Sequence, residues 1–382
     1  MRRTVALVLA LAVVLAGCGS DAGSGPPDGA AAYAIAPACP APALHHRSGL
    51  SVRGLNRIIS TLDLPGWQAG DIGASSQLSD GRMVWLFGDT VRADDVAPRL
   101  VANSMLVTSD ECVAQLHAPD GGPVIPDVSA DVVRWPMSVA VMRPLEEDAA
   151  EATDAIVVMC ARTRRGEGNL DYTFLGTSAA VFTVTANGVP VLRHIMEVTP
   201  DNEALDQVNW GAASVVEGPW FYVYGTRQTG EDFGRELYVG RAPIADPENR
   251  STWEFWDGSR WQGDIDRAGL ILPAQGGVSQ TLSVDRIDGT YVAVSKRDGD
   301  LGDFVYTWTA PTPVGPWTPN EGVAAPAGFD TGRLKYAPVA HPEIPLSDGK
   351  LLITISRNTT DFAQLLANPE VGRPVFAEVD RP

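Results

Sequence analysis

The feature that most constrains the fold is a pattern that occurs five times along the chain: a turn, a short apolar strand and a polar strand end. The five copies occupy residues 79–89, 153–162, 217–227, 288–297 and 347–357. Their turn residues, which are 74, 63, 71 and 60 positions apart, are Asp80, Asp154, Glu217, Asp288 and Asp348. Near-constant spacing over most of a chain is typical of repeat architectures, so the copies indicate five similar structural units.

Further strands flank each copy. Small-residue strands precede the copies at 72–75, 137–140, 211–215, 278–282 and 337–340, and further strands follow at 104–107, 180–184, 237–240, 304–308 and 375–379. Helical periodicity is nearly absent. Five sheets of about four strands predict an all-β fold, a five-bladed β-propeller, because each blade is one such sheet. The alternative is a two-domain β-sandwich protein, which the even spacing and the lack of a Pro/Gly linker near the middle disfavour.

The N-terminus reads as an export signal. Arg2 and Arg3 precede an apolar run at 4–16 that is too short to span a bilayer, so we expect residues 1–17 to be a signal peptide. The run ends in Leu-Ala-Gly-Cys, which resembles the lipobox of bacterial lipoproteins and implies cleavage before Cys18 and lipidation of that residue. An ordinary secretory signal is the alternative.

The rest of the chain divides into two parts. Residues 18–45 begin with Cys18, the expected lipidation site, and continue with a segment rich in Gly, Ala, Pro and Ser, whose composition predicts a disordered tether. Residues 46–382 form the propeller domain. We therefore expect a monomer on the extracytoplasmic face of the cell membrane, held there through its N-terminal lipid.

Charge excludes some partners. The chain carries 47 acidic and 29 basic side chains, a net charge of -18. A nucleic-acid-binding protein needs a basic face to neutralise phosphates, so we expect no nucleic acid as partner. The same balance disfavours docking on anionic lipid through a basic patch.

Three cysteines remain after Cys18. Cys160 ends the apolar run 155–160, which predicts a buried free thiol. The expected disulfide therefore joins Cys39 to Cys112, since an exported domain can hold disulfides. The Cys and His spacings do not suggest zinc, and we predict no cofactor. A structural or channel ion such as calcium stays an open alternative.

Propeller geometry places a group of polar residues on one face. In each blade the start of the first strand and the end of the second strand lie at the same mouth of the channel. In the first blade these positions hold Asp71 and Asp89. A pair of carboxylates at a glycosidic bond is the usual machinery for its hydrolysis, one as acid with a raised pKa and the other ionised as base or nucleophile. We therefore predict Asp71 and Asp89 as a catalytic pair.

The other blades supply cations, amides and aromatic rings at this mouth. Such groups suit a sugar polymer, because charged groups hydrogen-bond hydroxyls and ring faces stack on sugars. The predicted substrate-binding residues are Arg162, Asn209, Trp210, Arg227, Lys296, Tyr336, Arg357 and Asn358.

Each candidate also has a structural interpretation. Asp89 can cap a turn, and Asp71 can form an ion pair with an arginine, in which case Arg227 and Arg357 only neutralise the aspartates. His341 is expected to be a satisfied channel histidine, and Glu343 a structural group of the channel. Candidates for a third carboxylate in the mouth loops are Glu167, Asp171, Glu231 and Asp232.

Two stretches, 70–75 and 80–90, resemble a bacterial family known as domain of unknown function 4185. Further similar stretches follow in order at 209–213, 222–227, 256–261, 315–317, 341–343 and 373–376. The family includes endo-D-arabinanases, so the resemblance implies a five-bladed glycoside hydrolase with Asp71 and Asp89 as its paired aspartates. The chain departs from the family pattern at Ile72, where a more glycine-rich segment is expected.

The sequence as a whole favours a lipid-anchored glycoside hydrolase acting on furanose polysaccharide of the cell envelope, such as arabinan. The alternative is a propeller lipoprotein without catalytic activity that binds envelope glycan or a partner protein. A purely structural lipoprotein is the third possibility.

Overall fold

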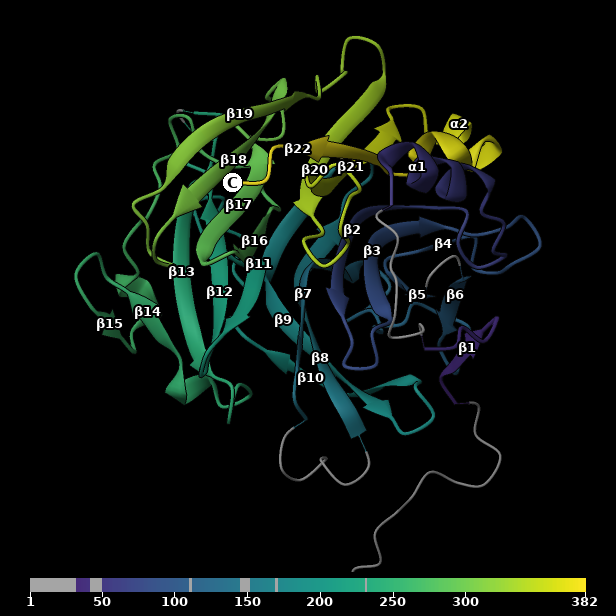
Figure 1. Ribbon diagram of the computed structural model, residues 1–382, viewed down its shortest axis with the longest axis horizontal. Helices are drawn as coiled ribbons and strands as arrows, with labels where there is room; N and C mark the ends of the chain where they lie inside the picture. Colours follow the sequence, from purple (N-terminus) through teal and green to yellow (C-terminus); the bar gives the residue numbers. More distant parts are fainter. Residues whose placement is uncertain (1–31, 42–49, 110–111, 145–151, 169–170, 231) are drawn as a thin grey trace, which may run out of the picture. The chain divides into compact units, whose positions relative to one another are not determined.

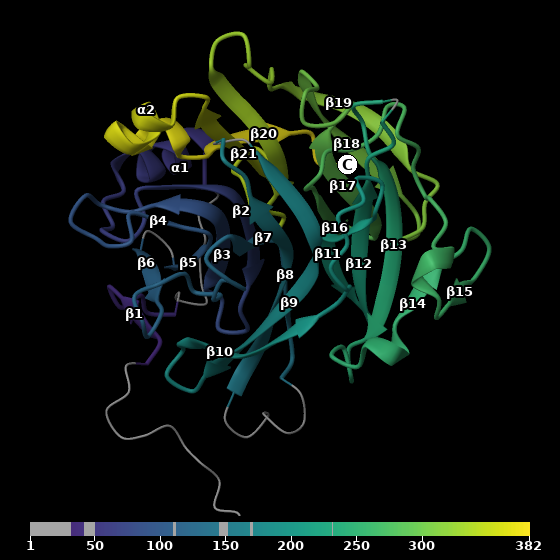
Figure 2. The ribbon, with the colours of Figure 1, turned by 180° about the vertical axis from the view of Figure 1, so that it is seen from behind.

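A computed structural model describes residues 32–41, 50–109, 112–144, 152–168, 171–230 and 232–382, which belong to one compact unit, Ala32–Pro382. The expected signal peptide and Cys18 lie outside the described residues. Five antiparallel sheets follow one another along the chain. They are the five blades of a β-propeller, and Figures 1 and 2 show their innermost strands converging on a common centre. The predicted fold is therefore confirmed.

In each blade the strands follow one another from the channel outward, mostly in chain order. Blade 1 contains β2 (Ala69–Gln77), β3 (Met83–Val91), β5 (Ser104–Ser109), β6 (Cys112–His117) and β1 (Ala34–Ala36), with β4 (Leu100–Val101) beside β3. Blade 2 contains β7 (Val132–Met142), β8 (Ala152–Arg165), β9 (Tyr172–Thr185) and β10 (Pro190–Glu197). Blade 3 contains β11 (Asn209–Glu217), β12 (Trp220–Arg227), β13 (Glu236–Pro243), β14 (Glu254–Trp256) and β15 (Trp261–Gln262).

The last two blades are smaller. Blade 4 contains β16 (Ser283–Ile287), β17 (Thr290–Lys296), β18 (Phe304–Ala310) and β19 (Thr318–Ala324). Blade 5 contains β20 (Arg333–Ala340), β21 (Leu351–Thr359) and β22 (Val375–Val379). The described residues also form three short 3-10 helices: η1 (Arg250–Thr252), η2 (Ile265–Arg267) and η3 (Pro369–Gly372).

The core fills the spaces between neighbouring blades. One apolar cluster joins blades 1 and 2 through Leu86 and Phe182, and another joins blades 2 and 3 through Val157 and Val223. The middle strands therefore have neighbours on both faces of their sheets. This arrangement explains why they appear in the sequence as continuous apolar runs rather than as alternating patterns.

The sequence-predicted strands agree with the structure in all blades except at the inner strand of blade 4. That strand was expected at 278–282, whereas β16 begins at Ser283. Val278 instead forms an isolated bridge with Arg235 of blade 3, and the Ser279 amide donates to Ser295 Oγ at 2.8 Å. The backbone groups of this segment are thus satisfied outside the ladder.

The expected tether at 18–45 overlaps the folded unit. Its residues Ala34–Ala36 form β1, which pairs with β6 at the outer edge of blade 1. Cys39 and Cys112 form the predicted disulfide, and Cys160 is a buried free cysteine, as predicted. The segment around β1 is therefore fixed to blade 1 by pairing and by a covalent bond.

Two helices, α1 (Val52–Thr61) and α2 (Phe362–Ala367), lie beside blade 5, as both ribbon views show. The Asn56 side chain on α1 donates to and accepts from the backbone of Phe376 on β22, each at 2.9 Å. The helix thereby satisfies part of an exposed strand edge, where the other blades continue with a fourth strand. Within the described part of the chain, no helix has the length and apolar character needed to cross a membrane.

Candidate active site

Asp71 and Asp89 lie opposite each other on neighbouring strands. Gly70 pairs with Thr90 and Ile72 with Phe87, so Asp71 on β2 faces the two residues Gly88 and Asp89 on β3. This is a β-bulge, a feature that often re-aims side chains next to active sites. Glycine at position 88 leaves room for the Asp71 carboxyl, because a Cβ there would collide with Asp71 Oδ1.

The backbone beside Asp71 is strained. Ile72 has φ = 66° and Gly73 has φ = 71°, so two successive residues occupy the left-handed region. For a β-branched residue this conformation is a true outlier that costs on the order of 1–3 kcal/mol. The Ile72 amide donates to Ser356 Oγ of blade 5 at 2.8 Å, which helps to hold the bend. The sequence departure noted at Ile72 therefore coincides with the strained residue.

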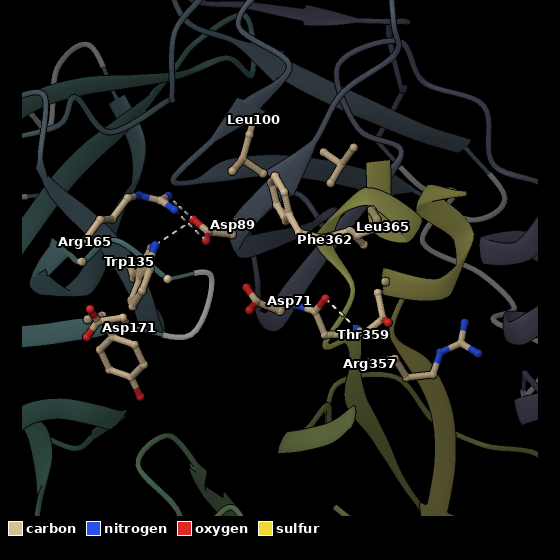
Figure 3. Close-up of a pocket in the computed structure, with 18 of the residues that line it drawn as sticks. Asp71, Asp89, Leu100, Trp135, Arg165, Asp171, Arg357, Thr359, Phe362 and Leu365 are labelled. Atoms are coloured by element: carbon tan, nitrogen blue, oxygen red, sulfur yellow. Dashed lines mark hydrogen bonds and ion pairs between the residues drawn. The ribbon is translucent and has the colours of Figure 1, made fainter. Parts of the chain in front are cut away.

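Blade 2 supplies the partners of Asp89. Arg165 at the end of β8 donates to both carboxylate oxygens, at 2.5 and 3.2 Å, and the Trp135 indole of β7 donates to Oδ1 at 2.8 Å. Figure 3 shows these bonds meeting at the Asp89 carboxylate. Both charged side chains stay about one-third exposed, at 33% for Arg165 and 30% for Asp89.

Blade 5 supplies the partners of Asp71. The Tyr336 hydroxyl on β20 donates to Asp71 Oδ2 at 2.7 Å. The Asn358 amide on β21 in turn donates to the Tyr336 oxygen at 3.3 Å. The two aspartates therefore have unlike environments: a neutral hydroxyl bonds one, and a guanidinium and an indole bond the other.

Because their environments differ, the two aspartates also differ in what raises and lowers their pKa values. Burial raises the pKa of Asp71 to about 7, the negative charge of Asp89 adds to the rise, and the hydrogen bond from Tyr336 opposes it. Burial also raises the pKa of Asp89, but there the charge and hydrogen bond of Arg165 oppose the rise, followed by the bond from Trp135. When the pair holds a single proton, it therefore resides on Asp71.

Two cavities meet at the aspartates. The helix-side cavity, of about 190 Å³, extends past Arg165 toward Phe362 and Leu365 of α2. The channel-side cavity, of about 470 Å³, extends past Tyr336 toward Gln280 and Asp300 of blade 4. Both are lined by Asp71, Asp89, Trp135, Tyr172 and Asn358. The carboxylates thus lie at the junction of one continuous cleft.

Four of the ten predicted catalytic and substrate-binding residues make polar contacts in the cleft or face it directly: Asp71, Asp89, Tyr336 and Asn358. Arg357 also lines the helix-side cavity, but its guanidinium donates to the backbone oxygens of Arg373 and Glu370. Figure 3 shows that its charged end points away from Asp71.

The structure does not bring the other five into the cleft. Arg162 is buried, where it contacts Glu197 and Asp201, and Arg227 pairs with Glu236 near the end of blade 3.

The other three predicted residues outside the cleft are all buried. Trp210 is fully buried, with its ring centroid 4.9 Å from that of Phe255, and Asn209 is buried at the start of β11. Lys296 is fully buried and donates to backbone carbonyls. The repeat pattern placed Asn209, Trp210, Arg227 and Lys296 correctly at strand ends, whereas β8 continues beyond Arg162. Neighbouring chain buries these side chains except that of Arg227, which is 37% exposed.

Sequence reasoning left Arg165 and Tyr172 out of the predicted site. The expected second strand of blade 2 ended at Arg162, whereas β8 continues to Arg165 and β9 begins at Tyr172. Because β8 and β9 are longer than expected, both residues lie at the mouth of the channel, where they line the helix-side cavity. Trp135, near the start of β7, was likewise outside the ten predicted site residues. The two consecutive arginines at 164–165, just after the predicted strand end, were the sequence signal that could have indicated a cationic site residue.

His341 is the satisfied channel histidine that the sequence suggested. Its Nδ1 lies 2.7 Å from Ser75 Oγ and its Nε2 lies 2.9 Å from Thr354 Oγ1. Burial lowers its pKa to about 3, so the ring is neutral. Among the residues that the structure describes, no group of three or more His, Cys, Asp or Glu side chains is placed to hold a metal ion.

Solved structures with the same fold include two that align over most of this chain. A candidate hydrolase from Bacteroides ovatus is 16% identical, with a TM-score of 0.64, over 85% of this chain and 88% of its own. A glycoside hydrolase family 43 arabinoxylan arabinofuranohydrolase from Bacillus subtilis is 13% identical, with a TM-score of 0.52. That alignment covers 84% of this chain and 64% of the Bacillus protein, less than two thirds of its length.

Sequence comparison gives one family. No curated protein matches the sequence. The family described as domain of unknown function DUF5005 matches residues 60–381, which include all five inner strands and both aspartates. The chain therefore belongs to the DUF5005 family.

Proposed function

We propose that this protein is an exported, lipid-anchored glycoside hydrolase that cuts furanose polysaccharide of the cell envelope, with arabinan as the expected substrate. The observation that carries the proposal is the aspartate pair at the junction of the two cavities. Burial raises the pKa of Asp71 to about 7, while Arg165 and Trp135 stabilise the charge of Asp89. Glycosidases require one carboxyl in each of these states.

The proposed reaction is hydrolysis of a glycosidic bond that lies across the junction of the cavities. Protonated Asp71 donates its proton to the leaving oxygen as the bond to the anomeric carbon breaks. Ionised Asp89 acts on the opposite side of the sugar, as base toward water or as nucleophile. In either case one water is consumed, and its hydrogen and hydroxyl are divided between the two products.

Binding residues support this assignment. Trp135 and Tyr172 place aromatic rings in the cleft, with centroids 5.3 Å apart, and ring faces of this kind stack on sugars. Asn358 and Tyr336 add hydrogen-bonding groups next to Asp71. The propeller of the Bacillus arabinofuranohydrolase is consistent with glycan chemistry on this fold, but a fold alone does not specify a reaction.

Arabinan as substrate rests on the resemblance to the family known as domain of unknown function 4185. The family that matches this chain is DUF5005, so the resemblance to domain of unknown function 4185 stays a prediction. The lipid anchor at Cys18, the membrane location and the monomeric state are likewise proposals. The Cys39–Cys112 disulfide supports an exported protein, because such bonds persist in oxidising compartments.

The test is incubation of the purified protein with arabinogalactan and with lipoarabinomannan, followed by separation of the released oligosaccharides. Asp71→Asn and Asp89→Asn serve as inactive variants, and Asp206→Asn, at an exposed position, serves as the matched control. Release by the wild type and the control alone supports a glycosidase. Equal release by all four proteins would refute the aspartate pair. No release from any folded form would favour a glycan-binding propeller without catalytic activity.

A further inference from the structure

The channel-side cavity holds polar groups that the proposed reaction does not use. Its blade 4 wall contains Gln280 and Asp300, and its blade 5 wall contains Lys335. Its volume of about 470 Å³ falls in the range of pockets that hold small ligands.

Gln280 has a fixed orientation. Its side-chain oxygen accepts from the Tyr172 hydroxyl at 3.2 Å and from Arg235 Nη2 at 3.3 Å. A guanidinium can only donate, so Arg235 identifies the oxygen of the amide, and the two contacts occupy its two lone pairs. The amide nitrogen is thereby directed elsewhere, and Gln280 lines the cavity. The residue therefore offers donors to a ligand there.

Asp300 lies beside Gln280 and offers acceptors. The Gln280 backbone amide donates to Asp300 Oδ2 at 3.4 Å, and the Arg235 guanidinium lies close enough for the charge of Asp300 to affect its pKa. The carboxylate lines the cavity and is half-buried. A donor amide and an acceptor carboxylate side by side match the two roles of a sugar hydroxyl.

A buried lysine holds these walls together. Lys296 is fully buried, and its ammonium donates to the Asp300 carbonyl at 3.2 Å and to the Lys335 carbonyl at 2.7 Å. It thereby joins the mouth loop of blade 4 to β20 of blade 5. A buried ammonium is costly and persists only where its hydrogen bonds are made, so both walls are ordered by the same group.

Much of the remaining lining is apolar. Phe329, Leu334, Pro136 and Met137 contribute to the same cavity, and Phe329 is 53% exposed. An exposed aromatic ring facing a cavity is a stacking surface for the C–H face of a sugar ring. The cavity thus combines hydrogen-bonding groups with an apolar face, as carbohydrate sites require.

We propose that the channel-side cavity is a sugar-binding subsite, in which Gln280 and Asp300 hydrogen-bond the hydroxyls of a unit next to the reacting one and Phe329 packs on its C–H face. This inference rests on the proposed function, because it assigns the neighbouring unit of the same polysaccharide to this cavity. Lys296 is a positioning residue of the subsite, since it acts through the Asp300 loop.

The test measures binding without cleavage. Asp71→Asn protein is titrated calorimetrically with arabinofuranose oligosaccharides of two and six units, and Asp300→Asn, Gln280→Ala or Lys296→Met is added to that background. We expect each added change to weaken binding of the six-unit oligosaccharide at least about tenfold. The matched control is Asp303→Asn, at an exposed position of the same loop, which is expected to leave the affinity unchanged.

The outcomes separate the two proposals. Unchanged affinity in both Asp300→Asn and Gln280→Ala would overturn the subsite, even where the wild type cleaves polysaccharide. Affinity that depends on Asp300 and Gln280, in a protein whose wild type cleaves nothing, would refute the hydrolase and leave the subsite standing. An equal loss in Asp303→Asn would also overturn the subsite, because it would trace the effect to the charge of the loop.

Discussion

At the scale of single residues, the two aspartates differ through the neighbours that other blades supply. Arg165 and Trp135 come from blade 2, whereas Tyr336 comes from blade 5. The same side-chain type therefore acquires two protonation behaviours within one blade. Removing Arg165 should change the pKa of Asp89 most, with a smaller effect on Asp71, whose pKa the charge of Arg165 also lowers.

Arg165→Met should raise the pKa of Asp89, because the guanidinium is the largest influence that opposes the effect of burial. Since Asp89 must be ionised, the acidic limb of the pH–rate profile should move to higher pH. The measurement is oligosaccharide release between pH 4 and pH 9. Arg164→Met, which removes the adjacent arginine that pairs with exposed Glu203, is the control. An acidic limb at the same pH in both variants would contradict this assignment.

Asp71→Asn should stabilise the protein at high pH. Folding raises the pKa of Asp71 from 3.8 to about 7. The protonated carboxyl therefore makes its full contribution to the free energy of unfolding below about pH 4, and this contribution is lost as the pH rises through 7. Asparagine stays neutral, so the variant should exceed the wild type by about 1–3 kcal/mol at pH 8 and by little at pH 4. Thermal unfolding at the two pH values provides the comparison. A constant difference would show that Asp71 does not titrate in this range.

Gly88→Ala should lower the rate at least about tenfold while the protein stays folded. The new Cβ would displace the Asp71 carboxyl, and a displacement of about 1 Å costs catalysis much more than stability. The measurement is kcat with circular dichroism as the check on folding. Gly263→Ala, where the nearest atom lies 3.9 Å from the added Cβ, is the control. Equal kcat values would mean that the position of Asp71 is not critical.

At the scale of elements, strands were predictable and helices were not. The second strands of the blades are buried on both faces, so their apolar runs mark them in the sequence. The helix α1 contains Gly54 and four β-branched residues, Val52, Ile58, Ile59 and Thr61, which gives it low intrinsic propensity. It depends on contacts with residues more than 300 positions away, such as Arg373 and Phe376. No local pattern reveals such contacts.

Arg373→Met should destabilise the protein by about 2–4 kcal/mol. Its buried guanidinium donates to the backbone oxygens of Ile59, Ser60 and Leu62 at the end of α1, and its Nε donates to the Gln68 carbonyl. Loss of the charge leaves these acceptors without their donor. Denaturant unfolding measures the effect, and Arg381→Met at the exposed Asp288 pair is expected to change stability by less than about 0.5 kcal/mol. Similar values for both variants would contradict the role of Arg373.

At the scale of the whole molecule, the repeat spacing was sufficient to predict five blades and the face on which Asp71 and Asp89 meet. The same rule placed Tyr336 and Asn358 in the cleft. It did not identify Arg165 or Asp300, because a strand extension and a mouth loop carry them, nor Gln280, because its segment was expected to be an inner strand and lies outside the ladder. The rule also predicted Trp210 and Arg162 as exposed residues of the mouth, whereas both are buried by neighbouring parts of the chain, which strand spacing does not reveal.

The central claim is that Asp71 supplies a proton for glycosidic cleavage, and the rate of oligosaccharide release as a function of pH tests it most directly. For the wild type acting on arabinogalactan, the rate should fall about tenfold per pH unit above pH 7, as Asp71 ionises. Asp71→Asn should be at least about 100-fold slower at pH 6 and should lack this limb. An Asp71→Asn protein that releases oligosaccharides at the wild-type rate, with the same decline above pH 7, would contradict the account.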